Sequence, residues 1–171
     1  MPLHQPFWCE ENCWHLAADP LVGPGERLVL FVSGTGGNVA CWGQHAAAPG
    51  EAVLWDYHVV VAVGGADGWQ VWDLDTRLGC PLPAAAWIAG TFPRPTQVVP
   101  RFQPRFLVLA AEDYRRDLTS DRGHMRDARG GWQRPLPAWP LIAGGGVPLA
   151  DYVARARYGL DLEALRLRLR S

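Results

Sequence analysis

Short apolar runs separated by glycine-rich turns mark the expected strands of this chain. Residues 28–32 (Leu-Val-Leu-Phe-Val) form one run, which ends at Ser-Gly-Thr-Gly-Gly before a second run at residues 39–42. This pattern predicts two strands paired as a hairpin. Apolar stretches at 52–63 and 69–74 flank Gly-Gly-Ala-Asp-Gly and predict a second hairpin. A shorter run at 105–109 predicts one further strand.

Other segments repeat their apolar residues at helical spacing. Cys9, Cys13 and Leu16 would share one face of a helix over residues 9–18, which Pro20 closes. Three further helices are expected, one within residues 84–89, one over 111–118 and one over 149–157.

The C-terminal third of the chain is less regular. Residues 119–146 are rich in Gly, Pro and Trp and predict a long ordered loop. In residues 160–169 the alternation of Leu and Arg fits a strand, whereas the composition fits a helix, and both alternatives stay open. Because no internal repeat or interdomain linker is evident, we expect a single α+β domain over residues 1–171 with an antiparallel sheet.

Charge and cysteine content narrow the classes of function. All 16 basic side chains are arginines, and 17 acidic side chains balance them to a net charge of −1, so we expect no nucleic-acid partner. The start of the chain lacks a secretion signal, and no apolar run approaches the roughly 20 residues that span a bilayer. We therefore expect a cytoplasmic protein without a membrane partner. Four irregularly spaced cysteines favour reduced thiols.

Cys9 stands at the predicted start of the first helix. There the free backbone N–H groups and the helix dipole favour an anion, which would lower the pKa of the thiol and could hold an oxyanion. The alternative is that Cys9 is a small buried hydrophobic residue, as most free cysteines are. Cys13, one turn further along the same face, is expected to belong to the core.

His58 lies inside the apolar run Leu-Trp-Asp-Tyr-His-Val-Val-Val and needs a polar partner there. If residues 64–67 form the turn, the antiparallel register places His58 opposite Asp73, and any even-numbered turn keeps Asp73 and Asp75 on the face of His58. Cys9, His58 and Asp73 would then supply the nucleophile, the proton shuttle and the orienting carboxylate of a cysteine hydrolase. The alternative for the pair is a buried hydrogen bond without a catalytic role.

A zinc site is the rival use of Cys9, Cys13 and His15. The spacing lacks a repeated C-x₂-C pair or an H-E-x-x-H helix, so we expect no metal ion. The glycines of the Ser-Gly-Thr-Gly-Gly segment are interpreted as turn residues, because no Gly-Lys-Ser/Thr follows them.

Four separated segments share their order and spacing with one known family. They are Trp-Cys-Glu-Glu-Asn at 8–12, Trp-Asp-Tyr-His-Val-Val at 55–60, Trp-Asp-Leu-Asp-Thr at 72–76 and Ser-Asp-Arg-Gly-His-Met at 120–125, and they resemble the protein N-terminal glutamine amidohydrolases. The resemblance implies that Cys9, His58 and Asp73 form a catalytic triad. It also implies an α/β/α sandwich related to papain-like and transglutaminase folds, a monomer, and no cofactor.

The resemblance further implies a reaction and a substrate. An N-terminal glutamine of a protein or peptide would be deamidated to glutamate through a Cys thioester, priming the product for N-degron processing. Reading the free α-ammonium calls for a carboxylate near the nucleophile, for which Glu10 and Glu11 are candidates, unless they serve as helix-start charges. Trp8, Asp121 and His124 complete the predicted substrate-binding residues, although Asp121 and His124 would equally suit stabilisation of the long loop.

Two other functions stay open on the residues alone. One is a different cysteine enzyme on the same scaffold, such as a protease or a transglutaminase, which would use the same triad. The other is a binding module that keeps the fold without catalysis.

Overall fold

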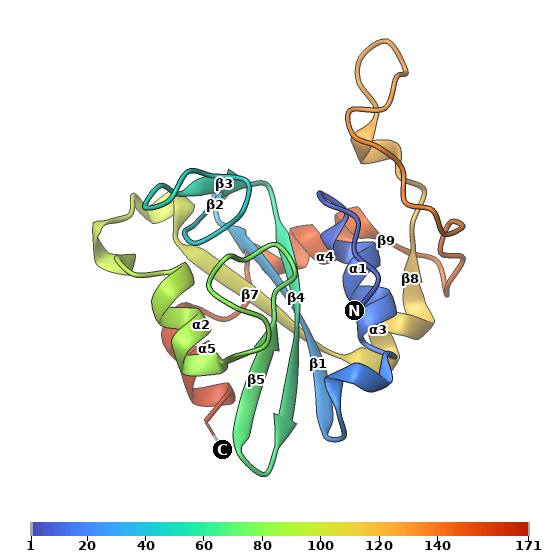
Figure 1. Cartoon of the computed structure of the whole chain (residues 1–171). Coiled ribbons are helices and arrows are strands. Elements are labelled where there is room, and N and C mark those ends of the chain that lie inside the picture. The colour runs from blue at the N-terminus through green and yellow to red at the C-terminus, as the bar shows by residue number, and fades with distance from the viewer. Residues whose placement is uncertain (1, 171) are drawn as a thin grey trace.

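The centre of the structure, a computed structural model that describes residues 2–170, is a five-stranded antiparallel sheet (Figure 1). Its strand order is β6-β5-β4-β1-β7, with β1 at Glu26–Gly34, β4 at His58–Gly65, β5 at Gly68–Trp72, β6 at Leu82–Pro83 and β7 at Pro104–Ala110. Two small sheets accompany it, antiparallel β2 (Val39–Cys41) with β3 (Val53–Trp55) and parallel β8 (Leu118–Thr119) with β9 (Val147–Pro148).

Helices cover both faces of the central sheet. One face carries α2 (Ala84–Thr91) and α5 (Leu162–Arg168), and the other carries α1 (Cys9–Leu16), α3 (Ala111–Asp117) and α4 (Leu149–Ala156) (Figure 1). Short 3₁₀ turns occupy Pro20–Val22, Pro95–Gln97, Pro100–Phe102 and Gly123–Met125. The predicted α+β class and the three-layer arrangement are confirmed. In the described residues no helix is long and apolar enough to cross a membrane.

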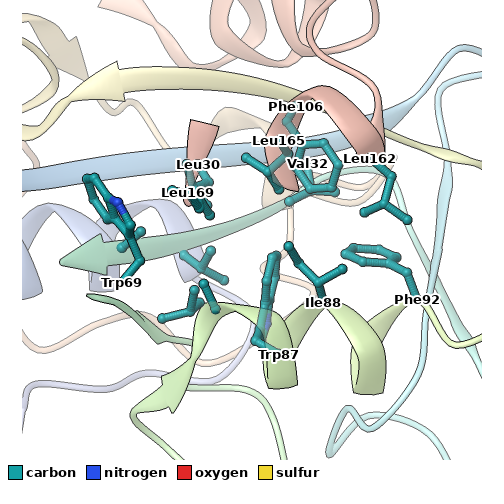
Figure 2. Close-up of a cluster of buried hydrophobic side chains, with 14 of the residues drawn as sticks. Leu30, Val32, Trp69, Trp87, Ile88, Phe92, Phe106, Leu162, Leu165 and Leu169 are labelled. Carbon is teal, nitrogen blue, oxygen red and sulfur yellow. The ribbon is translucent and has the colours of Figure 1, made fainter. Parts of the chain in front are cut away.

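The sheet is covered on both sides because its central strand is apolar on both sides. Alternate residues of a strand point to opposite faces, and β1 is buried from Leu28 to Gly34. Leu30 belongs to one buried cluster with Trp87 and Ile88 of α2 and the leucines of α5, and Figure 2 shows it beside Leu169. Full burial of each such side chain contributes roughly 1.5–3 kcal/mol, so this face anchors α2 firmly.

The opposite face of β1 forms the second core. Phe31 stacks on Tyr152 of α4 with ring centroids 5.2 Å apart, and it meets Tyr114 of α3 edge-on. Cys13 and Leu16 of α1 pack into the same cluster. This packing fixes α1, and therefore its first residue, against the sheet.

The predicted hairpin between residues 28–32 and 39–42 is wrong. β1 pairs with β4 on one side and β7 on the other, while β2 pairs with β3. A strand buried on both faces needs a partner on each edge, and these partners come from distant parts of the chain. β1 ends at Gly34, where only glycine fits, because a Cβ there would lie 2.1 Å from the backbone oxygen of Asn38.

The second predicted hairpin is confirmed with a shorter turn. Gly65 pairs with Gly68, so two residues form the turn instead of four, and the register moves by two residues. An even change preserves the face on which each side chain lies. The apolar stretch 52–63 is divided into β3 and β4, and β5 ends at Trp72.

The remaining predictions hold with changed ends. The first helix ends at Leu16 instead of residue 18, and the open alternative over 160–169 resolves as helix α5. Residues 120–146, between β8 and β9, are largely irregular and extend away from the helices (Figure 1). We call this segment the arm.

Candidate active site

Cys9 is the first residue of α1, and its side chain is almost completely buried, at 8% exposure. Its Sγ lies 3.8 Å from Oε2 of Glu10. Burial, and after it the charges of Glu10 and Asp75, raise the pKa of the Cys9 thiol well above its usual value. These effects oppose the lowering of the thiol pKa that the helix start predicts. Cys13 donates its S–H to the backbone oxygen of Val59 at 3.2 Å and lies in the core, as predicted.

His58 and Asp73 form a buried hydrogen-bonded pair. His58 is the first residue of β4, Asp73 follows the end of β5, and Nε2 of the imidazole lies 2.9 Å from Oδ1 of the carboxylate. The same Oδ1 accepts the backbone N–H of Asp75 at 3.1 Å. Oδ2 accepts the side-chain N–H groups of Gln44 and Trp87, each at 3.0 Å. The predicted contact is present, but the register that placed His58 directly opposite Asp73 is wrong, because Asp73 lies just past the end of β5. Four donors hold the carboxylate in one orientation.

The two partners change each other's protonation. Burial alone would lower the pKa of His58, but the charge and hydrogen bond of Asp73 outweigh it and raise that pKa above its usual value. Burial alone would raise the pKa of Asp73, but His58, Trp87 and Gln44 together lower it. The carboxylate of Asp73 therefore makes the His58 imidazole a stronger base and stabilises its cationic form.

Cys9 and His58 open onto one cavity of about 350 Å³. Trp55 stacks on the His58 ring with centroids 5.9 Å apart and planes 14° apart. Because Nε2 is bonded to Asp73, Nδ1 is the ring nitrogen left for proton exchange. The arm supplies part of the wall, and the lining residues are Phe7, Cys9, Trp55, Asp56, Tyr57, His58, Asp75, His124, Met125, Gln133 and Arg134.

Glu11 lies away from this cavity. Its carboxylate accepts bonds from Arg122 at 2.7 and 2.8 Å, from Ser120 at 2.5 Å and from Trp139 at 2.7 Å. Burial would raise the pKa of Glu11, but these donors lower it below its usual value. Both oxygens are thus occupied inside the protein, and the interactions tie the arm to α1. This placement does not support the prediction that Glu11 contacts substrate.

Glu10 is fully buried behind the nucleophile and does not line the cavity. Its Oε2 accepts the Tyr57 hydroxyl at 3.0 Å, and within residues 2–170 its Oε1 has no hydrogen-bond partner. Nε2 of His124 lies 3.5 Å from that oxygen and 3.2 Å from the Tyr57 hydroxyl. Burial, as the largest cause, raises the pKa of Glu10 to about 7.

The other predicted substrate-binding residues divide between the cavity and its surroundings. His124 lines the cavity. Trp8 is fully buried and donates its Nε1–H to the backbone oxygen of Pro135 at 2.8 Å, which holds the arm. Asp121 lines a neighbouring cavity of about 600 Å³ and accepts the Gly123 N–H at 2.8 Å.

Sequence reasoning missed several lining residues, above all Asp75. The sequence carried a signal for it, because the parity that placed Asp73 on the face of His58 also placed Asp75 there. No sequence pattern pointed to Phe7 or Arg134. They meet at the cavity because Arg134 of the arm lies against the N-terminal segment, with its guanidinium 3.8 Å above the Phe7 ring.

His58, Asp73 and Asp75 also have a spacing that a metal ion could use, since one ligand atom from each lies within 4.8 Å of the others. The donor set argues against that use. Asp73 already accepts four N–H groups, so neither oxygen has a free position for an ion. The arrangement fits a hydrogen-bonded carboxylate–imidazole pair better than a metal centre.

A helix-start thiol that shares a cavity with a carboxylate-bound histidine is the arrangement found in cysteine hydrolases. Residues 4–158 match the model of the family described as N-terminal glutamine amidase, and the chain belongs to that family.

Three proteins named "Protein N-terminal glutamine amidohydrolase" are similar to this chain over most of its length. The bovine protein is 34% identical over 146 residues, which cover 81% of this chain and 69% of the relative. The human protein is 33% identical over 146 residues, with 81% and 70% covered. The Arabidopsis thaliana protein is 32% identical over 165 residues, with 88% and 74% covered.

Proposed function

We propose that this protein hydrolyses the side-chain amide of an N-terminal glutamine, giving an N-terminal glutamate and ammonia, with Cys9 as nucleophile. Membership of the N-terminal glutamine amidase family supports the reaction. The observation that carries the assignment of residues is the hydrogen bond of 2.9 Å between His58 and Asp73, at the cavity onto which Cys9 opens.

The first half of the reaction forms a thioester. Nδ1 of His58 takes the Cys9 proton as Sγ attacks the carboxamide carbon, and the resulting oxyanion accepts backbone N–H groups at the start of α1, which have no intrahelical acceptor. His58 then donates the proton to the departing nitrogen, the C–N bond breaks, and ammonia leaves. Asp73 keeps the imidazole oriented and stabilises its cationic form throughout.

The second half restores the enzyme. Nδ1 of His58 takes a proton from water as the water oxygen attacks the thioester carbon. The C–S bond breaks, the substrate leaves as glutamate, and the proton returns to Cys9. Because the thiol pKa is raised by burial, thiolate exists mainly while the proton sits on His58, so nucleophile activation depends on the His58–Asp73 pair.

Around the triad, we assign His124 to the substrate side of the site and Glu10, which does not line the cavity, to its support. His124 lines the cavity and is held by Tyr57, while Glu10 anchors the Tyr57 hydroxyl from behind. We assign Trp8, Glu11 and Asp121 no direct contact with the substrate, because their hydrogen bonds hold the arm or the turn near its start. The arm would then set the shape of the cavity that receives the glutamine side chain.

The partners that follow from this function are proteins or peptides with an N-terminal glutamine. We propose a monomer that works without nucleic acid, membrane or cofactor, in the reducing cytoplasm. All four cysteines are free thiols, which suits a reducing compartment. Its product, a protein with an N-terminal glutamate, would enter N-degron processing.

Ammonia release from two peptides of equal composition tests the reaction. One peptide begins with glutamine, and the other carries glutamine internally. The proposed function predicts release from the first only, whereas a transglutaminase would also use the internal glutamine and a protease would cleave the backbone. Backbone cleavage seen by mass spectrometry, or release from the internal position at a similar rate, would refute it.

The nucleophile is tested by Cys9→Ala with Cys13→Ala as the matched control. Cys9→Ala should abolish turnover by a factor on the order of 10³ or more while the circular dichroism spectrum stays unchanged. Cys13→Ala removes a thiol from the same helix face and should keep turnover within about threefold, with a modest loss of stability. Wild-type ammonia release by Cys9→Ala would refute Cys9 as the nucleophile, whereas absence of ammonia release by the wild type itself would support the binding-module alternative.

A further inference from the structure

Glutamine at position one differs from internal glutamine by its free α-ammonium, so a site that selects it needs an anion within reach of the reacting carbon. Several carboxylates lie near the nucleophile, but most of them already have hydrogen-bonding partners or lie outside the cavity. Asp73 accepts four N–H groups, Glu11 is paired with Arg122, and Glu10 is fully buried outside the cavity lining. Asp56 and Asp75 are the carboxylates among the cavity-lining residues.

Asp75 is the one of these two that is joined to the catalytic pair. One of its oxygens lies within 4.8 Å of both a His58 ring nitrogen and an Asp73 oxygen, and its backbone N–H donates to Asp73. Asp56 is exposed, and its Oδ1 already accepts the side-chain amide of Asn38 at 2.6 Å.

The Asp75 carboxylate is open to a nitrogen ligand. Its side chain is 14% exposed, and across residues 2–170 no hydrogen bond is recorded for Oδ2. Its Oδ1 accepts Nε2 of His4 at 3.2 Å, from a side chain that is itself one-third exposed. An exposed histidine on the N-terminal segment therefore occupies the position that a cationic nitrogen of a substrate could take.

We propose that Asp75 binds the α-ammonium group of the substrate and thereby distinguishes an N-terminal glutamine from an internal one. This inference rests on the proposed amidase function. The length of the glutamine side chain agrees with this proposal. Four bonds separate the α-nitrogen of glutamine from its carboxamide carbon, a span of roughly 5 Å. An ammonium held by Asp75 thus leaves the carboxamide carbon near His58 and the thiol that His58 serves. On binding, the ammonium displaces His4 from Oδ1.

The same contact links recognition to chemistry. The pKa of Cys9 is raised first by burial and then by the charges of Glu10 and Asp75. A bound ammonium cancels the charge of Asp75, so thiolate formation becomes easier when the correct substrate is present. An acylated or internal glutamine has no such charge. Selection therefore acts on kcat as well as on KM.

The test compares a Gln-initiated peptide with its desamino analogue, in which hydrogen replaces the α-amino group. In the wild type, kcat/KM for ammonia release should favour the free amine by roughly 10- to 100-fold, the range of a charged hydrogen bond. In Asp75→Asn, kcat/KM for the free amine should fall by that factor, while the value for the desamino peptide should not fall and should rise to the extent that the lost charge eases thiolate formation. Asp75→Asn keeps the backbone bond to Asp73, and a thermal melt checks its fold.

Asp56→Asn is the matched control and should keep the preference for the free amine. The proposal is overturned if Asp75→Asn lowers both peptides equally, if its preference survives, or if the preference collapses in Asp56→Asn instead. A calorimetric titration of both peptides in a Cys9→Ala background measures the preference without turnover. Absence of ammonia release by the wild type, with a binding preference that Asp75→Asn removes, would refute the proposed function and leave the role of Asp75 standing.

Discussion

Nε2 of His58 lies 2.9 Å from Oδ1 of Asp73, and both side chains are almost completely removed from solvent. A buried histidine with one ring nitrogen committed to a carboxylate has a fixed tautomer and a fixed ring plane. The stacked Trp55 ring restricts it further. In the proposed mechanism, proton exchange with Cys9 therefore falls to Nδ1, and its efficiency should depend on the geometry of the pair.

Replacing that carboxylate by an amide tests this dependence. Asp73→Asn should lower kcat by a factor on the order of 10²–10⁴, because the imidazolium loses its counter-charge. Since Asp73 raises the pKa of His58, the acidic limb of the kcat/KM profile should move to lower pH in the variant. Asp67→Asn, on the exposed β4–β5 turn, is the control and should change neither quantity. An unshifted acidic limb in Asp73→Asn would contradict the pairing.

Glu10 predicts a pH dependence of stability. Its pKa is raised by burial from a usual value of 4.5 to about 7, so the folded chain holds this proton more tightly than the unfolded chain. The stability contributed by the protonated form is complete below pH 4.5 and is lost as the pH rises through about 7. Glu10→Gln should flatten this slope and should raise the free energy of unfolding at pH 8 by up to roughly 3 kcal/mol.

Urea unfolding at pH 5 and pH 8 measures the effect of Glu10→Gln. The substituted amide still offers an oxygen to the Tyr57 hydroxyl, so the difference between the two pH values isolates the charge. Glu112→Gln, an exposed carboxylate in the first turn of α3, should leave the slope unchanged. Equal slopes in the wild type and Glu10→Gln would mean that Glu10 titrates normally.

Sequence patterns predicted the features of the fold and the site that depend on local periodicity. The helices followed from apolar spacing, and the contact between His58 and Asp73 followed from the two-residue period of strands, which a turn shortened by two residues leaves intact. The reaction came from resemblance in four short segments. The pairing of β1 could not be obtained this way, because its partners are chosen by burial on both edges, far along the chain.

Local sequence patterns also did not predict the electrostatic environments of Cys9 and Glu11. At Cys9 the start of a helix is visible in the sequence, but the depth of burial of the thiol and the effect of the Glu10 charge on its pKa are not. Glu11 looked free to bind substrate because its partner Arg122 is 111 residues away in sequence. A carboxylate's availability depends on such distant donors, and therefore only the folded chain reveals it.

The buried pair of Glu11 and Arg122 predicts a large loss of stability when one partner is removed. Arg122→Ala leaves the Glu11 carboxylate buried with reduced compensation and should lower the free energy of unfolding by about 3–5 kcal/mol. Activity should fall with it, because the arm that walls the cavity loses its tie to α1. Arg168→Ala breaks an exposed pair with Glu26 at a similar distance, 2.8 Å, and should cost less than about 1 kcal/mol. Similar losses for the two variants, measured by urea unfolding, would contradict this account.

Trp87 links the core to the site, because its Nε1–H donates to Oδ2 of Asp73 at 3.0 Å while its ring packs under the sheet (Figure 2). Trp87→Phe keeps an aromatic ring but leaves that oxygen one donor short. The pKa of Asp73, which this bond helps to lower, should rise, and kcat should fall by roughly tenfold, since hydrogen bonds to charged groups are worth about 1.5–3 kcal/mol.

Trp69→Phe provides the matched comparison for this last prediction. Trp69 belongs to the same buried cluster, and no hydrogen bond of its indole is recorded within residues 2–170. Both variants shrink one tryptophan in one core, so both should lower the melting temperature. Only Trp87→Phe should lower kcat and move the acidic limb of the pH profile, because only Trp87 touches Asp73. Equal kcat losses in the two variants would show that core packing, and not the bond to Asp73, limits the reaction.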